Sequence, residues 1–254
     1  MQTTGNTILI TGGSSGIGRA LAESFHKLGN QVIVAGRRRA LLDEVTAANP
    51  GMASAVLDVA SLDSLAPFAA DLVGRFPSLN VLINNAGIMK NENLADGSDN
   101  TATADETITT NLLSVFRLTA ALLPHFQKQP RAAIMTVSSG LAFLPLAATP
   151  TYCATKAAIH SWSQSLRYQL RNTSVEVLEL IPPYVQTELQ GSHQLSDPRA
   201  MPLPDFIAEV MNILTTQPDA REIMVQRVHP LRFAAEKGQA AYDAFFKTLN
   251  DSMH

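Results

Sequence analysis

Tyr152 and Lys156 stand four residues apart in a segment whose apolar pattern predicts a helix over residues 151–172. Residues at this spacing lie on one helical face, so the lysine ammonium can sit beside the phenol. A nearby positive charge lowers the pKa of a phenol, which is otherwise a poor base at neutral pH. The pair therefore offers proton-transfer chemistry, although the same spacing also occurs in ordinary surface pairs.

A glycine-rich stretch near the start, with Gly12, Gly16 and Gly18, is a second candidate for chemistry. It follows an apolar segment of strand length and precedes one with helical periodicity. Glycine lets the backbone turn sharply and approach a pyrophosphate, and the start of a helix favours an anion. The stretch predicts a dinucleotide-phosphate site, although its spacing is not Gly-x-Gly-x-x-Gly.

Both candidates belong to a chain in which strand and helix patterns alternate. The apolar segments of strand length are residues 7–10, 31–35, 53–57, 79–83, 132–137, 175–181 and 222–226. They are continuously apolar, which is typical of parallel strands covered by helices on both faces. With right-handed crossovers, the pattern predicts an α/β fold, a Rossmann-type doubly wound parallel sheet in a single domain over residues 1–254. Residues 89–105 are predicted to form a long loop that leads into a helix, and residues 231–249 a last helix.

Polar or glycine-rich residues follow most of the predicted strands, at the edge where such sheets bind ligands. They are Gly12 to Gly18, Arg37, Asp58, Asn84 to Gly87, Ser138 with Ser139, and Pro182 to Thr187. Each alone is a weak signal, because every strand ends in a turn. Together they place polar groups along one edge of one sheet.

In this order and spacing the motifs resemble those of the short-chain dehydrogenase/reductase family, over nearly the whole chain. Asn111 and Ser139, which stands thirteen residues before Tyr152, complete the match. The resemblance implies an NAD(P)-dependent oxidoreductase that interconverts a carbonyl and a secondary alcohol. The alternative is a non-catalytic nucleotide-binding redox sensor on the same fold, which could lose the tyrosine or the lysine.

The resemblance also implies roles for individual residues. Tyr152 would be the general acid or base, Ser139 would orient the substrate oxygen, and Asn111 would support a water that relays the proton. Lys156 would hold the nicotinamide ribose and lower the tyrosine pKa. The implied coenzyme-binding residues are Gly12, Ser14, Ser15, Gly16, Ile17, Gly18, Arg37, Asp58, Val59, Asn85, Ala86, Gly87, Tyr152, Lys156, Pro182 and Thr187. Pro183 departs from the family, which usually has glycine there.

The end of the second strand predicts NADP(H) rather than NAD(H). NAD-specific relatives carry an acid there that bonds the ribose 2′-hydroxyl. In this chain Gly36 takes that place, Arg37 follows it, and Ser14 can approach the same phosphate. Arg38 and Arg39 are equally consistent with a solvated helix start.

The bulk composition excludes several classes of function. A net charge of −3 gives no reason to expect a nucleic-acid partner. Cys153 is the only cysteine, so no disulfide or thiolate metal cluster is expected, and we expect it, with His160, to be structural. No apolar run is long enough for a membrane span and no signal peptide is evident, so a cytoplasmic protein without a metal is expected.

Substrate and assembly are less strongly encoded. Residues 140–155 lack charged side chains, and Leu141, Phe143, Leu144 and Leu146 either line a pocket for a neutral, apolar carbonyl or alcohol or simply pack. The family resemblance implies a homodimer or homotetramer built on the helices around residues 105–127 and 151–172. Their apolar faces carry Leu112, Phe116, Leu123, Ile159, Trp162 and Leu166.

Overall fold

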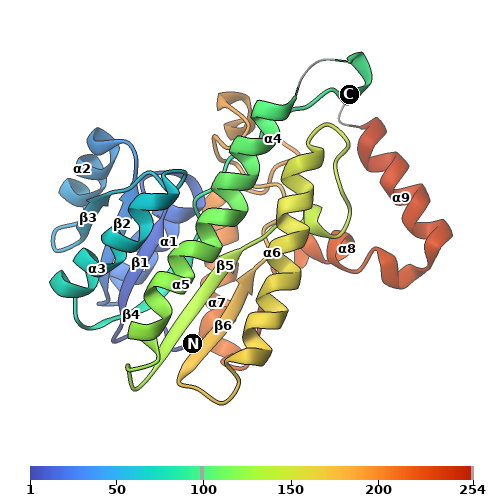
Figure 1. The fold of residues 1–254 in the computed structure, drawn as a ribbon. Helices are drawn as coiled ribbons and strands as arrows, with labels where there is room; N and C mark the ends of the chain where they lie inside the picture. Colours follow the sequence, from blue (N-terminus) through green and yellow to red (C-terminus); the bar gives the residue numbers. More distant parts are fainter. Residues whose placement is uncertain (98–99, 253–254) are drawn as a thin grey trace.

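The computed structural model describes residues 1–97 and 100–252, and a seven-stranded parallel sheet runs through its centre (Figure 1). The strands are β1 (Thr7–Thr11), β2 (Gln31–Gly36), β3 (Ala53–Val56), β4 (Leu79–Asn84), β5 (Ala132–Val137), β6 (Val175–Leu180) and β7 (Glu222–Ile223). Their spatial order is β3-β2-β1-β4-β5-β6-β7. The chain thus winds outward in both directions from β1 and β4, as the predicted doubly wound fold requires.

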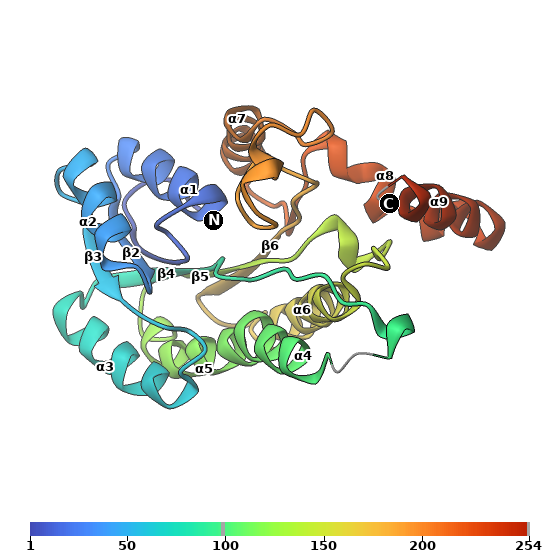
Figure 2. The same ribbon diagram turned by 90° about the horizontal axis from the view of Figure 1, so that it is seen from above.

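The central strands are apolar throughout because helices cover both faces of the sheet (Figure 2). In β1, Ile8 and Ile10 pack toward one face and Leu9 toward the other, and all three are fully buried. The first face is covered by α1 (Gly16–Lys27), α2 (Arg39–Ala48) and α7 (Leu203–Thr216). The second face carries α3 (Leu65–Arg75), α4 (Thr101–Ile108), α5 (Ser114–Phe126) and α6 (Pro150–Gln169). Both layers leave the carboxyl ends of the strands free to bind ligands.

The C-terminal part differs from the sequence prediction. Only Glu222–Ile223 of the expected last strand pairs with β6, because a 3-10 turn begins at Gln226. The expected last helix is divided into α8 (His229–Arg232) and α9 (Gln239–Asp251). Gly238, with φ of +89°, lies at the break, a conformation that a side chain disfavours. As Figures 1 and 2 show, α9 projects beyond the end of the sheet that carries β6.

In the predicted loop at residues 89–105, whose tail was expected to enter a helix, α4 begins at Thr101. Residues 98 and 99 of that prediction lie outside the described part of the chain. Between α4 and α5 the chain makes a π-helical turn, Thr109–Leu113. Such turns are rare and occur often at functional sites, and this one contains Asn111.

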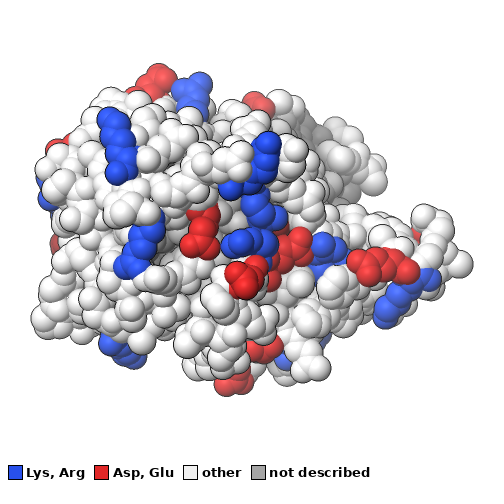
Figure 3. Space-filling model, turned by 90° about the horizontal axis from the view of Figure 1, so that it is seen from below, with Lys and Arg blue, Asp and Glu red and all other residues white. Residues whose placement is uncertain are grey.

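In the described ranges, no helix combines the length and the apolar character that a membrane crossing requires. Basic and acidic side chains lie next to one another over the middle of the face seen from below (Figure 3). Ion pairs such as Arg221–Glu176, with 3.4 Å between nitrogen and oxygen, join neighbouring surface groups. Mixed charge of this kind leaves the local field weak.

Candidate active site

The glycine loop joins β1 to α1, as predicted, but its glycines serve the packing of the protein itself. Gly12 has a φ of +66°, and a Cβ there would lie 2.9 Å from the Ala86 Cα. A Cβ on Gly18 would lie 2.4 Å from Nδ2 of Asn85. Only glycine lets the loop lie this close to the segment that leaves β4.

Thr11, which the site prediction omitted, holds these two segments together. Its hydroxyl accepts hydrogen bonds from the backbone N–H groups of Asn85 (3.0 Å) and Ala86 (3.1 Å). The Asn85 amide in turn donates to the carbonyl of Thr11 at 3.0 Å. Threonine is common at the end of a strand, so the residue type alone does not indicate that Thr11 joins the glycine loop to the segment after β4.

The start of α1 faces a cavity of about 690 Å³ at the carboxyl edge of the sheet. Ser15 is the N-cap residue, yet its side chain makes no capping bond, so the first-turn N–H groups remain available to a ligand. Its hydroxyl instead accepts from Nη2 of Arg38 at 3.1 Å. Arg37 and Arg38 both line the cavity, whereas Nη1 of Arg39 lies 3.9 Å from a carboxylate oxygen of Asp43 on α2. Arg38 therefore belongs to the site, which the sequence left open.

The groups expected to surround a dinucleotide line this cavity together. They are Gly12, Ser14, Ser15, Gly16, Ile17, Arg37, Asp58, Val59, Asn85, Ala86, Gly87, Tyr152, Lys156, Pro182 and Thr187. Gly18 lies outside the lining, against Asn85. Helix-start N–H groups, hydroxyls and two guanidinium groups form a donor set that fits a dinucleotide with a further phosphate.

The catalytic candidates meet at the other end of the cavity. Tyr152 and Ser139 both line the cavity, and the Ser139 side chain is close enough to the phenol to lower its pKa; the Ser139 oxygen accepts from the Leu141 N–H at 3.1 Å. Nζ of Lys156 lies 5.5 Å from the centre of the tyrosine ring and donates to the carbonyl of Val137 at 2.7 Å. The sequence placed these side chains together, and they do lie together.

The pKa of Tyr152 moves in the opposite direction to the one that the sequence predicted. Burial raises the phenol pKa above its usual value, and the Ser139 side chain lowers it by less. Burial also lowers the pKa of Lys156 to about 8, with a smaller raising effect from Glu179. A nearby ammonium lowers the pKa of a phenol, but the fold also removes water from around both groups, and burial has the larger effect on Tyr152.

Asn111 is fully buried and fixes the segment that follows Gly87. Its side-chain oxygen accepts from the N–H of Ile88 at 2.9 Å, and its amide donates to the Ile88 carbonyl at 2.8 Å. The same amide lies 3.4 Å from the hydroxyl of Thr155, one residue before Lys156. Asn111 thus connects the π-helical turn, the β4 exit and α6.

The segment after β6, Pro182 to Thr187, lines the cavity and lies beside the glycine loop. The carbonyl of Pro182 accepts from the N–H of Gly140 at 2.9 Å, which ties this segment to the end of β5. Thr187 accepts from the Gln194 amide at 3.2 Å and lies beside Gly16. Pro183, which stands where the family usually has glycine, also lines the cavity, and as a proline it offers no backbone N–H.

The expected substrate pocket is corrected in part. Leu141 and Leu146 line the cavity, but Leu144 is fully buried in the protein and Phe143 packs on His160. The wall is completed by Tyr184, which lies in the predicted segment Pro182 to Thr187, and by Leu189, Arg199, Leu231 and Leu249. Leu231 and Leu249 lie in a segment that carried no motif, so the sequence offered no reason to place them at the site.

The C-terminal helix is fastened over this end of the cavity. Asn250 on α9 accepts from the N–H of Ala147 at 2.6 Å and donates to the carbonyl of Pro145 at 3.3 Å. Nη1 of Arg199 donates to the carbonyl of Ser252 at 3.0 Å. The end of α9 is therefore part of the wall of the site.

Two further side chains near Tyr152 have structural contacts, as expected. The thiol of Cys153 is buried and accepts from the N–H of Leu146 at 3.3 Å. His160 lies 2.8 Å from a carboxylate oxygen of Glu179. Neither side chain lines the cavity.

Comparisons with known proteins agree with this arrangement. A family profile described as short chain dehydrogenase matches residues 6–197. DltE, an uncharacterized oxidoreductase of Bacillus subtilis, is 41% identical over 253 residues, which cover 98% of each chain. An NADP-dependent 3-hydroxy acid dehydrogenase of Schizosaccharomyces pombe is 33% identical over 233 residues, 84% of this chain and 88% of the relative. A short chain dehydrogenase of Burkholderia cenocepacia, solved in complex with NADP, superposes with a TM-score of 0.83 at 23% identity, covering 97% of this chain and 99% of that one.

Proposed function

Because the chain belongs to the short-chain dehydrogenase/reductase family of NAD(P)-dependent oxidoreductases, we propose that it interconverts a carbonyl and a secondary alcohol with NADP(H). The observation that carries this proposal is the meeting of Tyr152, Ser139 and Lys156 at one cavity, with the Lys156 nitrogen 5.5 Å from the centre of the tyrosine ring. We further propose that residues 1–254 form one domain that works in the cytoplasm, where the thiol of Cys153 stays reduced.

In the proposed reduction, Ser139 holds the carbonyl oxygen and Tyr152 donates the proton to it. The raised pKa of Tyr152 keeps the phenol protonated at neutral pH, as a proton donor must be. Lys156, with a pKa near 8, is protonated there and holds the coenzyme ribose. Bound NADPH supplies a hydride to the carbonyl carbon. Asn111 keeps the wall beside Lys156 in place and supports the water through which the proton is replaced.

Coenzyme choice is proposed to rest on the basic residues after β2. Arg37 and Arg38 line the cavity, and Gly36 stands where an acid would reject a 2′-phosphate. Arg38 is already oriented by its bond to Ser15. The Burkholderia cenocepacia protein of the same fold is solved with NADP, which is consistent with this preference.

The substrate is proposed to be a neutral, fairly apolar carbonyl compound. At the substrate end, Lys90 and Arg199 line the cavity together with Lys156, and each of these two is paired with a carboxylate, Lys90 with Glu106 and Arg199 with Asp197. Hydrogen bonds from Arg199 hold the pKa of Asp197 well below its usual value, so this pair stays charged at neutral pH. Paired cations attract a substrate anion less than unpaired ones.

The experiment is a substrate screen that follows the absorbance of reduced nicotinamide. NADPH is offered with neutral ketones and aldehydes, and NADP⁺ with secondary alcohols and with 3-hydroxy acids, the class named for the Schizosaccharomyces pombe relative. We expect turnover with neutral apolar carbonyls. Coenzyme binding without turnover of any substrate would favour the redox-sensor alternative, and a strong preference for 3-hydroxy acids would contradict the neutral substrate.

A further inference from the structure

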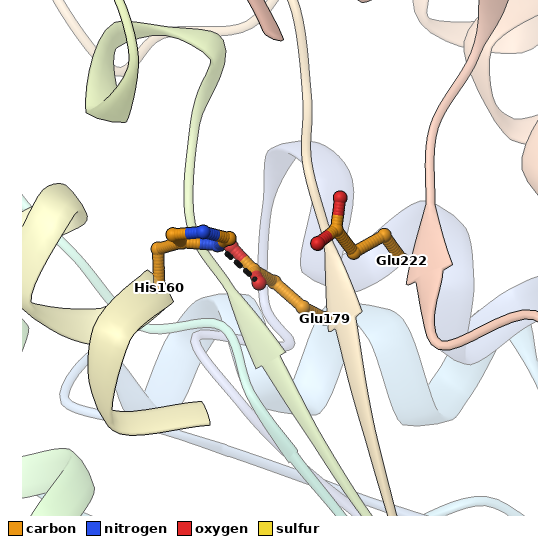
Figure 4. A group of neighbouring side chains, drawn as sticks. All are labelled: His160, Glu179 and Glu222. Atoms are coloured by element: carbon orange, nitrogen blue, oxygen red, sulfur yellow. Dashed lines mark hydrogen bonds and ion pairs between the residues drawn. The ribbon is translucent and has the colours of Figure 1, made fainter. Parts of the chain in front are cut away.

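Glu179 on β6 is a buried carboxylate that contacts Ser138, the residue before Ser139. It is fully buried, and it accepts a hydrogen bond of 2.5 Å from the hydroxyl of Ser138. Its other oxygen lies 2.8 Å from Nδ1 of His160, and Figure 4 shows the two side chains pointing toward each other. A buried carboxylate is costly, so a chain that keeps one beside its active site gains something specific from it.

The first effect of Glu179 is geometric, because Ser138 precedes Ser139. The backbone N–H of Ser138 donates to the Leu180 carbonyl at 2.9 Å, and that of Gly140 donates to the Pro182 carbonyl at 2.9 Å. These bonds fix the backbone on both sides of Ser139, but they leave the Ser138 side chain unattached. The bond to Glu179 is the one that holds it.

The second effect is electrostatic. Lys156 is buried, which disfavours its charged form, and Glu179 is the acid that acts in the other direction. Nζ of Lys156 donates to the carbonyl of Val137, the residue next to Ser138. The Glu179 carboxylate and the Lys156 ammonium therefore both contact the end of β5, the carboxylate at Ser138 and the ammonium at Val137.

We propose that Glu179 is a positioning residue, which orients the end of β5 through Ser138 and keeps the Lys156 ammonium charged for coenzyme binding. The titratable and charged groups that face Glu179 are Lys156, His160 and Arg167 on α6, Glu222 on β7, and Arg232 on α8. The charged and titratable groups that face Lys156 are Tyr152 and Glu179.

The cluster of His160, Glu179 and Glu222 has a spacing that could suit a metal ion, but its contacts favour the positioning role. Glu222 already forms two bonds with Arg232, of 2.8 and 3.1 Å. Arg232 also stacks on the ring of Phe143, at 4.5 Å from its centre. The guanidinium supplies the positive charge that an ion would bring.

The first test measures coenzyme affinity, which does not require the substrate to be known. NADPH binding is followed by fluorescence from pH 6 to pH 10 in the parent, in Glu179→Gln and in Glu176→Gln. The glutamine keeps an acceptor for Ser138 but removes the charge, so Lys156 loses its proton at lower pH. We expect the affinity of Glu179→Gln to fall with a midpoint about one pH unit below that of the parent. At pH 8 this corresponds to binding weaker by about fivefold, and the factor approaches about tenfold at higher pH.

Glu176 is the matched control, because it lies three residues earlier on β6 at the surface and pairs with Met1 and Arg221. Its glutamine variant should follow the parent curve. An unchanged midpoint in Glu179→Gln would overturn the electrostatic half of the proposal. If that variant does not fold, Glu179→Asp takes its place, and it must keep the parent midpoint while its turnover falls, because the charge stays and the bond to Ser138 lengthens.

The second test isolates the hydrogen bond and rests on the proposed function, since it needs a substrate from the screen. Ser138→Ala keeps the charge of Glu179 but removes its partner. We expect kcat to fall about tenfold or more, with the KM for NADPH and the binding midpoint unchanged. A parent-like kcat in Ser138→Ala would overturn the geometric half, whereas a parent without turnover would count against the proposed function and leave the binding result standing.

Discussion

Tyr152 carries the chemical step in the proposed reaction, because it is the buried proton donor that contacts Ser139. Tyr152→Phe removes the hydroxyl and keeps the ring, so the packing of α6 and the coenzyme cavity should persist. We expect the rate of carbonyl reduction to fall by about 10²–10⁴ or more. NADPH affinity, measured in parallel, should stay within about twofold of the parent. Turnover at the parent rate would refute the assigned mechanism.

We expect Lys156 to reduce the free energy of unfolding at neutral pH, because its ammonium is buried. Its pKa is lowered to about 8 from 10.5, so below pH 8 the folded chain holds a buried charge, at a cost on the order of 3 kcal/mol. Between pH 8 and 10.5 the unfolded chain binds more protons, so stability from this group rises with pH. Lys156→Met removes the cost and also the bond to Val137, which contributes about 1 kcal/mol.

We therefore expect the free energy of unfolding of Lys156→Met, measured by urea denaturation at pH 7, to exceed that of the parent by about 2 kcal/mol. The difference should shrink as the pH rises from 8 toward 10.5. NADPH binding and turnover should both weaken, because the ammonium holds the ribose. A variant that is less stable than the parent at pH 7 would show that the ammonium stabilises the fold.

Arg37 and Arg38 should make the protein bind NADPH more tightly than NADH. A charge-assisted bond to the 2′-phosphate is worth about 1.5–3 kcal/mol, or roughly 10- to 150-fold in affinity. Arg37→Ala, and Arg38→Ala separately, should weaken NADPH by such a factor and NADH only slightly. Arg39→Ala is the matched control, since Arg39 lies outside the cavity near Asp43. Equal loss for both coenzymes would contradict the assignment.

At the residue scale, the sequence was sufficient where chemistry needs a type at a fixed spacing along one element. Tyr152 and Lys156, four residues apart on α6, were predicted in this way, whereas Ser139 was predicted from the family resemblance. It was insufficient for contacts between elements, such as the bond of Thr11 to the β4 exit or of Arg38 to Ser15. The predicted lowering of the Tyr152 pKa was wrong for the same reason, because the burial that raises this pKa is a property of the fold.

At the element scale, the sheet and its two helical layers followed from the continuous apolar strands, since only parallel strands covered on both faces need them. The C-terminal elements were placed less well. The apolar residues of α9 repeat at helical spacing, but its contact with residues 145–147 depends on the backbone path through Gly238. Periodicity carries no information about such a path.

The attachment of α9 predicts an effect on substrate binding. Asn250→Ala removes both hydrogen bonds to the loop at residues 145–147, so the wall that includes Leu249 loosens. We expect the KM for the carbonyl substrate to rise about three- to tenfold, with the KM for NADPH unchanged. Thr248→Ala is the control, because that hydroxyl bonds only to its own helix, at Ala244. Equal KM values in parent and Asn250→Ala would show that α9 does not shape the pocket.

At the scale of the whole molecule, α5 and α6 lie on the outside of one layer (Figure 2). Ile159 and Leu166, which the sequence assigned to a subunit interface, are buried within the chain instead. The outer face is formed by Phe116 and Trp162, whose ring centres lie 4.8 Å apart, and by the partly exposed Leu113. Ala157 and Ser161 leave room beside them for a second helix pair.

We propose that this face joins two copies of the chain across a two-fold axis, so that four helices pack together. A stable dimer buries about 1,600 Å² in total, which two helices from each copy can supply. Light scattering at micromolar concentration should give twice the chain mass of 27.3 kDa. Ala157→Arg places a charge in the middle of the face and should yield monomers, whereas Ala70→Arg, at an exposed alanine of α3, should leave the assembly intact. A parent that scatters as a single chain would reject the interface, and assembly that survives Ala157→Arg would place it on another face.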